Sequence, residues 1–358
     1  MKLSKSLLGG VTALGVALAA PPPASAAETS WRVTSASLPQ LSRLQDVTAT
    51  GPSAAWAVGY QNHSFVGVPA GLQFYAVMRW NGSRWAQEQL PGDPSNLTGV
   101  SAAGNADVWT VGHADEFVPY AAHFNGRTWT NHRPLGDDRF ATLNDVAARA
   151  GRAVFVGSKH PNPKIVEWDG QRFTDVAVTV PDSWSNGLYS VSTASDGVTS
   201  AVGETYRADG SGPYPLALQR RNGAWRVMPM PDIVNARLLS VAARSANDVW
   251  AVGTIDDSYT RQPLIMHFNG QSWRQIAAPV SNAPLQTVAV DAGGTVWIAG
   301  HDETRRLALY LSYRAGRWTV ERGTGDLAIS GLAAIPGTTG GFWGVGTDGT
   351  GAVIARRG

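Results

Sequence analysis

The sequence predicts an all-β protein, a seven-bladed β-propeller of four-stranded blades, and three observations lead to this fold. A signal close to Trp-x-Val-Gly recurs along the chain, and its final glycines are Gly59, Gly112, Gly157, Gly203, Gly253, Gly300 and Gly346. Their spacing of 45 to 53 residues is typical of a repeat array or a propeller. Each repeat holds four short alternating runs bounded by turn residues, which predicts four strands. Seven such repeats predict seven blades.

One repeat shows the predicted elements in order. Residues 239–242, Leu-Ser-Val-Ala, form the inner strand, and a turn with Asn247 and Asp248 follows. Residues 249–253 form the second strand, and residues 265–268 form the third. An Asn-Gly turn, which favours a hairpin, then leads to Trp273 in the outer strand.

The two ends of the chain are expected to share the last blade. The final repeat stops after its third strand, at residues 352–358. Residues 30–34, which contain Trp31, read like the outer strand around Trp225. We therefore expect the N-terminal strand to complete the C-terminal blade, which closes the ring and removes open sheet edges.

Residues 1–26 have the features of a secretory signal peptide. Lys2 and Lys5 precede an apolar run, and a small-residue cleavage site ends at Ala26. This predicts a secreted, extracellular protein whose mature part, residues 27–358, is the propeller. The apolar run is too short to favour a membrane span. No membrane span is therefore expected after cleavage.

Composition restricts the classes of partner and cofactor. The chain has no cysteine, so it forms neither disulfides nor a thiolate metal site. The formal net charge is +2 with 16% charged residues, which gives no basic stripe for nucleic acid. We expect a monomer without a cofactor.

Most of the 14 tryptophans are expected to be structural. Thirteen fall at positions that recur once per blade, where a large aromatic ring packs one sheet against the next. Trp184 alone lies outside the repeat pattern, in the loop of residues 180–187. Trp184 is therefore the tryptophan we expect to contact a ligand.

The repeats also resemble known propellers. Residues 168–173, Trp-Asp-Gly-Gln-Arg-Phe, are similar to a degenerate Asp-box, with Glu167 where the fuller motif has Ser or Thr. The whole mature chain resembles the secreted bacterial propellers built from Asp-Val-Trp-Ala-Val-Gly and Asn-Gly-x-x-Trp repeats, which are grouped loosely with kelch and galactose-oxidase-like propellers. The kelch double glycine is absent. A galactose-oxidase-type copper site implies a cysteine-linked tyrosine, which this chain cannot form.

Departures from the repeat concentrate on one predicted face, formed by the loops after the second strand and before the first. These loops carry His63, Asp115, Glu116, Glu204, Tyr206, Asp256 and His301, among others, and Arg237 precedes a first strand. Loops on a rigid scaffold usually carry the binding groups. Because blades two to four are neighbours, we expect the ligand-binding residues to be His113, Glu116, Arg139, Asn144, Asp145, His160, Trp184 and Tyr189.

Neither a metal nor a catalytic set is expected from local motifs. His113 and His301 lie too far apart around the ring to share an ion, which leaves His113 with His160 as the alternative pair. No nucleophile elbow or His-Glu-x-x-His motif is present. A site assembled across blades would use His113 or Tyr189 with Arg139, or Asp46 with Asp145. The catalytic residues therefore stay unknown.

The sequence thus predicts a secreted propeller that binds an extracellular carbohydrate or a cell-surface partner through its loop face. The first alternative is a polysaccharide lyase or glycoside hydrolase with its site at the channel mouth. The second is a protein–protein interaction scaffold with an exposed apolar patch, for which Phe65, Phe117 and Tyr120 are candidates.

Overall fold

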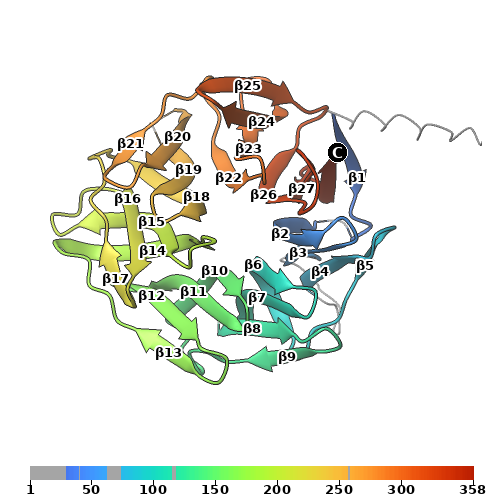
Figure 1. Ribbon diagram of the computed structural model, residues 1–358, viewed down its shortest axis with the longest axis horizontal. Helices are drawn as coiled ribbons and strands as arrows, with labels where there is room; N and C mark the ends of the chain where they lie inside the picture. Colours follow the sequence, from blue (N-terminus) through green and yellow to red (C-terminus); the bar gives the residue numbers. More distant parts are fainter. Residues whose placement is uncertain (1–29, 40, 63–73, 115–117, 257–258) are drawn as a thin grey trace, which may run out of the picture.

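The chain folds as a ring of seven antiparallel sheets. The computed structural model describes residues 30–39, 41–62, 74–114, 118–256 and 259–358. Within these ranges it contains seven four-stranded sheets and no helix, arranged around a common axis (Figure 1). The predicted fold class is confirmed. The predicted signal peptide, residues 1–26, lies outside the described residues, and no described segment is a helix long and apolar enough to cross a membrane.

The first four blades follow one another along the chain. Blade 1 consists of β2 (Arg43–Gly51), β3 (Ala54–Tyr60), β4 (Tyr75–Trp80) and β5 (Trp85–Gln87). Blade 2 consists of β6 (Pro94–Gly104), β7 (Asp107–Ala114), β8 (Pro119–Phe124) and β9 (Trp129–His132). Blade 3 consists of β10 (Ala141–Arg149), β11 (Arg152–Lys159), β12 (Asn162–Trp168) and β13 (Phe173–Val176). Blade 4 consists of β14 (Ser183–Thr193), β15 (Thr199–Arg207), β16 (Tyr214–Arg221) and β17 (Ala224–Val227).

The last three blades complete the ring. Blade 5 consists of β18 (Ala236–Ser245), β19 (Asp248–Asp256), β20 (Arg261–Phe268) and β21 (Trp273–Gln275). Blade 6 consists of β22 (Leu285–Val290), β23 (Val296–Asp302), β24 (Leu307–Arg314) and β25 (Arg317–Arg322). Blade 7 consists of β26 (Ala328–Ala334), β27 (Phe342–Thr347), β28 (Ala352–Arg357) and the N-terminal strand β1 (Trp31–Ser35). In every blade the first-named strand lies nearest the ring axis (Figure 1).

The N-terminal strand closes the ring, as the sequence predicts. β1 pairs with β28 in antiparallel register, with Val33 opposite Ala355 and Trp31 opposite Arg357. The Trp31 ring stacks on Tyr310 of blade 6, with ring centroids 3.9 Å apart. β1 therefore gives the last blade its fourth strand and covers the edge of β28, which would otherwise be open to another chain.

The recurring glycine is explained by a bulge in each inner strand. In blade 5, Leu238 pairs with Gly253 and Ser240 pairs with Val252, so Leu239 is an extra, unpaired residue. The bulge brings a carbonyl against the glycine: a Cβ on Gly253 would lie 2.0 Å from the oxygen of Arg237. Equivalent Cβ atoms on the other six repeat glycines would lie 1.9–2.2 Å from a carbonyl oxygen. Only glycine fits there.

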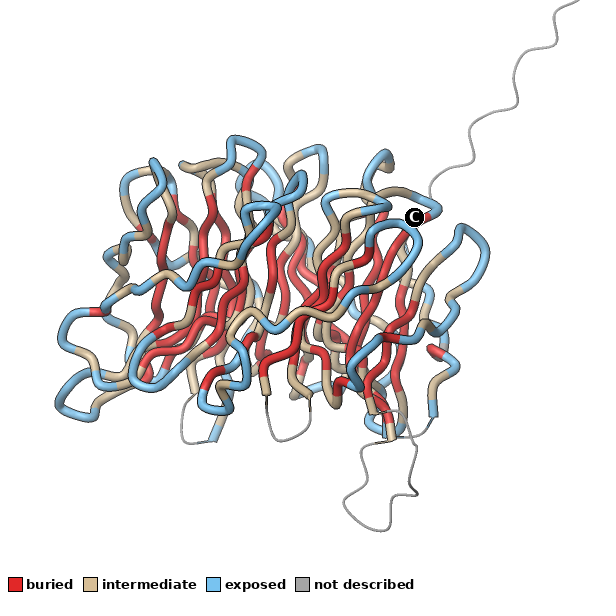
Figure 2. Tube along the Cα trace, turned by 90° about the horizontal axis from the view of Figure 1, so that it is seen from below, coloured by how far each residue is buried: buried red, intermediate tan, exposed pale blue. Residues whose placement is uncertain are grey.

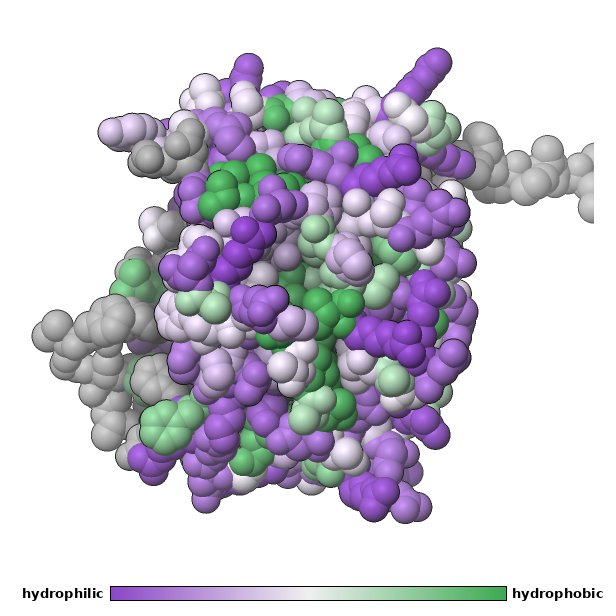
Figure 3. Space-filling view, turned by 90° about the vertical axis from the view of Figure 1, so that its left-hand side faces the viewer, coloured by the Kyte–Doolittle hydropathy of each residue, from purple (hydrophilic) through white to green (hydrophobic). Residues whose placement is uncertain are grey.

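The core lies between adjacent blades. Trp109 of blade 2 is fully buried and packs edge-on against Phe155 of blade 3, with centroids 5.3 Å apart. Figure 2 shows the buried residues in the middle of each strand and the exposed residues in the loops at the two faces. Figure 3 shows that hydrophilic side chains cover most of the outer rim on one side, with hydrophobic groups gathered in its middle.

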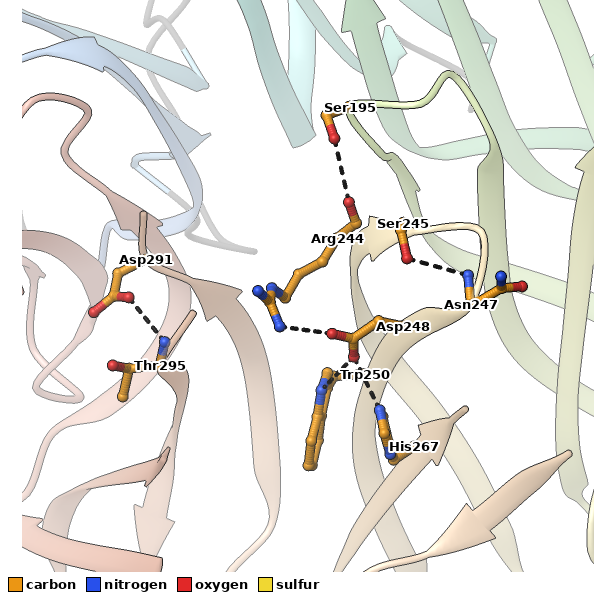
Figure 4. A network of polar contacts seen from close by, with 9 residues as sticks. All are labelled: Ser195, Arg244, Ser245, Asn247, Asp248, Trp250, His267, Asp291 and Thr295. Atoms are coloured by element: carbon orange, nitrogen blue, oxygen red, sulfur yellow. Dashed lines mark hydrogen bonds and ion pairs between the residues drawn. The ribbon is translucent and has the colours of Figure 1, made fainter. Parts of the chain in front are cut away.

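The Asp-Val-Trp motif of blade 5 anchors a polar network at the face opposite the loop face. Asp248 is hydrogen-bonded to His267 Nε2 at 2.9 Å and accepts from Trp250 Nε1 at 3.1 Å. Its second oxygen accepts from Arg244 at 2.6 Å (Figure 4). The Trp250 ring stacks on His267, with centroids 4.2 Å apart. The motif is thus a structural device that fixes the indole for packing against the next blade.

Candidate functional site

The exposed large hydrophobic residues of the described chain all lie on one face. They sit in loops that enter a first strand or connect a second strand to a third: Leu41, Phe140, Trp184, Val234 and Tyr259. We call this the loop face. The C-terminus, which ends a third strand, marks the opposite face and lies at the top in Figure 2. Of these five residues, Trp184 packs against further aromatic rings.

Trp184 is the centre of an aromatic cluster on the loop face. Its residue is 47% exposed at the start of β14. Its ring meets His160 of blade 3 edge-on, with centroids 5.6 Å apart, and lies tilted against Tyr206 of β15 at 5.8 Å. His160 lies in the connection between β11 and β12 and is itself exposed. Three rings from two blades therefore form a surface that solvent reaches.

A polar cluster lies next to these rings, between blades 4 and 5. Tyr189 donates a hydrogen bond to Glu204 Oε1 at 2.6 Å. Arg237 lies between two carboxylates, with Nη2 3.1 Å from Asp256 Oδ2 and Nε 3.6 Å from Glu204 Oε2. Glu204 and Tyr206 lie two positions apart on β15, so the two clusters lie side by side.

One contact within the polar cluster is incomplete. Arg237 Nε and Glu204 Oε2 are buried atoms, and neither has a hydrogen-bond partner in the described part of the chain. Their separation of 3.6 Å is too long for a hydrogen bond. Buried polar atoms without a hydrogen-bond partner are few in native proteins. Arg237 thus forms ion pairs with Asp256 and with Glu204, and the contact with Glu204 is open in the sense that it lacks a hydrogen bond.

The pKa of Tyr189 is unfavourable for general-base catalysis. Burial, and then the hydrogen bond to Glu204, raise the pKa of its hydroxyl above the usual value. A tyrosine base needs a pKa near the working pH, which requires a shift in the other direction. In the free protein Tyr189 therefore acts as a hydrogen-bond donor.

Asn144 and Asp145, expected at the inner edge of the site, connect blades instead. Asn144 Nδ2 donates to the carbonyl of Leu188 in blade 4 at 2.7 Å. Asp145 accepts backbone N–H groups with both oxygens, from Val146 at 2.7 Å and from Val191 of blade 4 at 2.9 Å. Asp46 is used in the same way between blades 1 and 2, with Val100 as its partner at 2.8 Å.

Two of the remaining sequence candidates, His113 and Arg139, lie in other segments of the loop face. His113, at the end of β7, is hydrogen-bonded through Nδ1 to Ser95 at 2.9 Å. Arg139 is exposed in the loop before β10. Glu116 lies outside the described residues. Of the eight predicted ligand-binding residues, the structure thus brings together His160, Trp184 and Tyr189.

The clusters contain four residues that were not among the predicted ligand-binding set: Glu204, Tyr206, Arg237 and Asp256. Their sequence signal is present, because all four depart from the repeat in loop-face segments. What the sequence does not give is which loops of neighbouring blades converge. The aromatic and polar clusters therefore span blades 3 to 5, whereas the predicted ligand-binding set spans blades 2 to 4.

The candidate patch for protein–protein interaction also changes. Tyr120 is 2% exposed and its hydroxyl donates to the carbonyl of Pro91 at 2.7 Å, so the expectation that it is an exposed patch residue is wrong. Phe65 and Phe117 lie outside the described residues. Across the described ranges, no group of three or more His, Cys, Asp or Glu side chains is placed to hold a metal ion.

Comparison with known proteins adds a fold likeness. No protein-family profile and no curated protein matches the chain. It is similar to YCF48 bound to a D1 peptide, with a TM-score of 0.61, 15% identity and coverage of 91% of this chain and 96% of that one. For virginiamycin B lyase from Staphylococcus aureus the TM-score is 0.64, with 9% identity and coverage of 91% and 99%.

A larger enzyme shares the same fold over part of its length. For the GH74 xyloglucanase from Xanthomonas campestris the TM-score is 0.60, with 12% identity and coverage of 90% of this chain and 53% of that one. At these identities the likeness concerns the propeller fold alone. That fold serves both binding proteins and enzymes, so function has to be argued from the site.

Proposed function

We propose that the protein binds an extracellular carbohydrate through the aromatic and polar clusters of blades 3 to 5. The observation that carries the proposal is the half-exposed Trp184, which lies between His160 and Tyr206 next to the open Arg237–Glu204 contact. Secretion by the predicted signal peptide is part of the same proposal.

The two clusters suit the two kinds of surface on a sugar. A pyranose ring has an apolar C–H face, which packs on an aromatic ring with little conformational loss. Its hydroxyl groups donate and accept, and pairs of them match the fork of a guanidinium or a carboxylate. The side chains of Arg237 and Asp256 are 33% and 36% exposed, so both can offer polar atoms to such hydroxyls.

Binding is favoured over catalysis at this site. The pKa of Tyr189 is raised, and the two oxygens of Asp145 already accept backbone N–H groups between blades. Asp46 is engaged in the same way, so the carboxylate pair expected for a hydrolase serves the scaffold. The lyase or hydrolase alternative is left with His113 and Arg139 as its catalytic set. The sequence alternative of a cell-surface protein partner stays open as an outcome of the test.

The test compares Trp184→Ala and Arg237→Gln with the unaltered protein on a panel of neutral and uronic-acid oligosaccharides, followed by intrinsic tryptophan fluorescence. We expect at least a tenfold loss of affinity for the bound sugar in both variants. Phe140→Ala is the matched control, because Phe140 is 85% exposed on the same face and is not part of either cluster. Equal affinity of Trp184→Ala and the unaltered protein would overturn the proposal, as would turnover of the bound polymer.

A further inference from the structure

The second strand of each blade has a position that tryptophan occupies in five of seven blades. These residues lie three positions before the repeat glycine and are Trp56, Trp109, Trp250, Trp297 and Trp343. Each is at most 5% exposed. Each packs toward the following blade, as Trp56 does against Phe124 and Trp297 against Phe342. In five of the seven blades, the side chain that packs against the following blade at this position is therefore an indole.

Blades 3 and 4 lack this tryptophan, and different side chains lie at its position in the two blades. Blade 4 has Ser200, and Gln219 from the next strand donates to Ser200 Oγ at 3.2 Å and to the carbonyl of Ala246 in blade 5 at 3.1 Å. Gln219 is 3% exposed, so its side chain lies in the space next to the serine. Blade 3 has Val154, which stays half-buried, whereas the five tryptophans are buried.

A hollow of about 440 Å³ lies where the indole of blade 3 is missing. It opens on the face opposite the loop face, between blades 3 and 4, because its wall includes the turns at Arg149–Arg152 and at Gly197. Val154 and Ala153 line it from blade 3, with Trp168 on the same blade, and Thr193 and Thr199 line it from blade 4. We call it the Val154 hollow. Its size is that of a small-molecule pocket.

The third-strand residue opposite this position, which stacks on the indole in other blades, has a different role in blade 3. In blades 2 and 5 the tryptophan stacks on a histidine of the third strand, His123 or His267. In blade 3 that position is Glu167, opposite Val154. Glu167 accepts two hydrogen bonds from Arg220 of blade 4, at 2.6 and 3.0 Å, and one from Trp225 Nε1 at 2.8 Å. The hollow is thus bridged by an ion pair that holds the two blades together around it.

The charge around the hollow is positive. Three arginines line it, Arg149, Arg152 and Arg220, against two carboxylates, Glu167 and Asp169. Glu167 pairs with Arg220, and Asp169 lies 3.4 Å from Arg172. Arg149 donates to the carbonyl oxygens of Ala194 at 2.9 Å and Ser195 at 2.7 Å, which carry no formal charge. The turn that Arg149 caps also carries the carboxylate of Asp196, so the excess positive charge at the wall comes from Arg152.

We propose that the Val154 hollow binds a small planar ring that carries an anionic group. The ring occupies the space that an indole fills in the other blades, against the side chains of Val154 and Ala147, which face blade 4. The anionic group lies toward the guanidinium group of Arg152, where a carboxylate or sulfonate forms charge-assisted hydrogen bonds. This site is separate from the carbohydrate site on the loop face and does not depend on it.

The test uses indole-3-acetate, which joins an indole ring to a carboxylate, in NMR titrations with the mature protein. Tryptamine supplies the same ring with a cation, and acetate supplies the carboxylate without a ring. We expect indole-3-acetate to bind at least tenfold more tightly than either. Tryptamine binding as tightly as indole-3-acetate would contradict the assigned charge, and acetate binding as tightly would contradict the ring site.

Two substitutions locate the binding. Val154→Trp restores the residue of the other blades, so it should fill the hollow and abolish binding of indole-3-acetate with no fall in melting temperature. Arg152→Gln, at an exposed position, should keep the fold and reduce affinity at least fivefold. In Trp184→Ala, which alters only the loop face, the probe should bind as in the unaltered protein. Binding that survives both hollow variants, or that is lost in Trp184→Ala, would overturn the proposal.

Discussion

Asp145 of blade 3 accepts a hydrogen bond from the backbone N–H of Val191 in blade 4, at 2.9 Å, and so ties two inner strands together. The same position after the bulge is Ser190 in blade 4, which accepts from Val241 at 3.2 Å, and Ser240 in blade 5, which accepts from Val288 at 3.1 Å. Neighbouring blades are thus linked by a repeated side-chain bridge. In blade 3 that bridge is made by an ionisable group.

The first prediction follows from the ionisation of this bridge. Burial, and then the charge of Asp46, raise the pKa of Asp145 to about 8, and burial raises the pKa of Asp46 to about 6. An unfolded aspartate has a pKa of about 3.9. Between about pH 4 and pH 8 the folded state therefore binds more protons than the unfolded state. The stabilisation from the protonated groups is present below pH 4 and is lost as pH rises toward 8.

We accordingly expect the free energy of unfolding of the unaltered protein to fall by about 1 kcal/mol or more from pH 5 to pH 8. Asp145→Ser should flatten this decline, because serine is the chain's own residue at this position in blades 4 and 5 and does not titrate there. Urea unfolding at several pH values measures the free energy of unfolding of the unaltered protein and of Asp145→Ser. Parallel pH profiles for the two proteins would contradict the assignment.

Ring closure gives the second prediction. Removing the chain up to Ala36 deletes β1, together with its ladder to β28 and the Trp31–Tyr310 stack. We expect a marked fall in melting temperature and an increased tendency to associate, because β28 becomes an exposed edge. Trp31→Ala in the full chain isolates the side chain and should cost about 3 kcal/mol. A truncated protein that melts like the intact one would show that closure does not depend on β1.

The sequence predicts the scaffold well and the site in part, and the difference has a physical cause. The repeat glycines locate every bulge because the clash that excludes a Cβ is local to one blade. Trp184 is found because it departs from the repeat. The sequence predicts Asp145 as a ligand-binding residue, and the structure shows it at a repeat position where Ser190 and Ser240 make the same bridge between blades. The repeat spacing along the sequence does not show which residues of neighbouring blades form hydrogen bonds. The sequence therefore does not identify Val191 as the partner of Asp145.

The polar cluster likewise could not be predicted from the sequence. Glu204 and Arg237 are 33 positions apart, and their side chains meet only because blades 4 and 5 are adjacent and twisted. The sequence indicates that both lie on the loop face. It does not indicate which loop-face residues point toward each other, since side-chain direction depends on the curvature of each blade.

The third prediction concerns the glycine at the bulge. Gly253→Ala would place a Cβ 2.0 Å from the carbonyl oxygen of Arg237, so the two strands must separate. We expect a loss of about 1–3 kcal/mol, as for an overpacked core. Gly104→Ala is the matched control, because no atom lies within 4 Å of its Cβ. It should change stability by about 0.5 kcal/mol or less. Equal effects of the two changes in thermal unfolding would refute the clash.

The last prediction separates the structural tryptophans from Trp184. Trp250 is 5% exposed, stacks on His267, and donates through Nε1 to Asp248 (Figure 4). Trp250→Ala removes the ring from the boundary with blade 6 and should cost about 3–5 kcal/mol. Trp250→Phe keeps a ring but loses the N–H donor, so we expect a smaller cost of about 1–2 kcal/mol. Trp184→Ala should stay within about 0.5 kcal/mol of the unaltered protein, since its residue is 47% exposed. Chemical unfolding of the three variants measures these differences, and a Trp184→Ala loss as large as that of Trp250→Ala would mean that Trp184 is part of the core and not a binding residue.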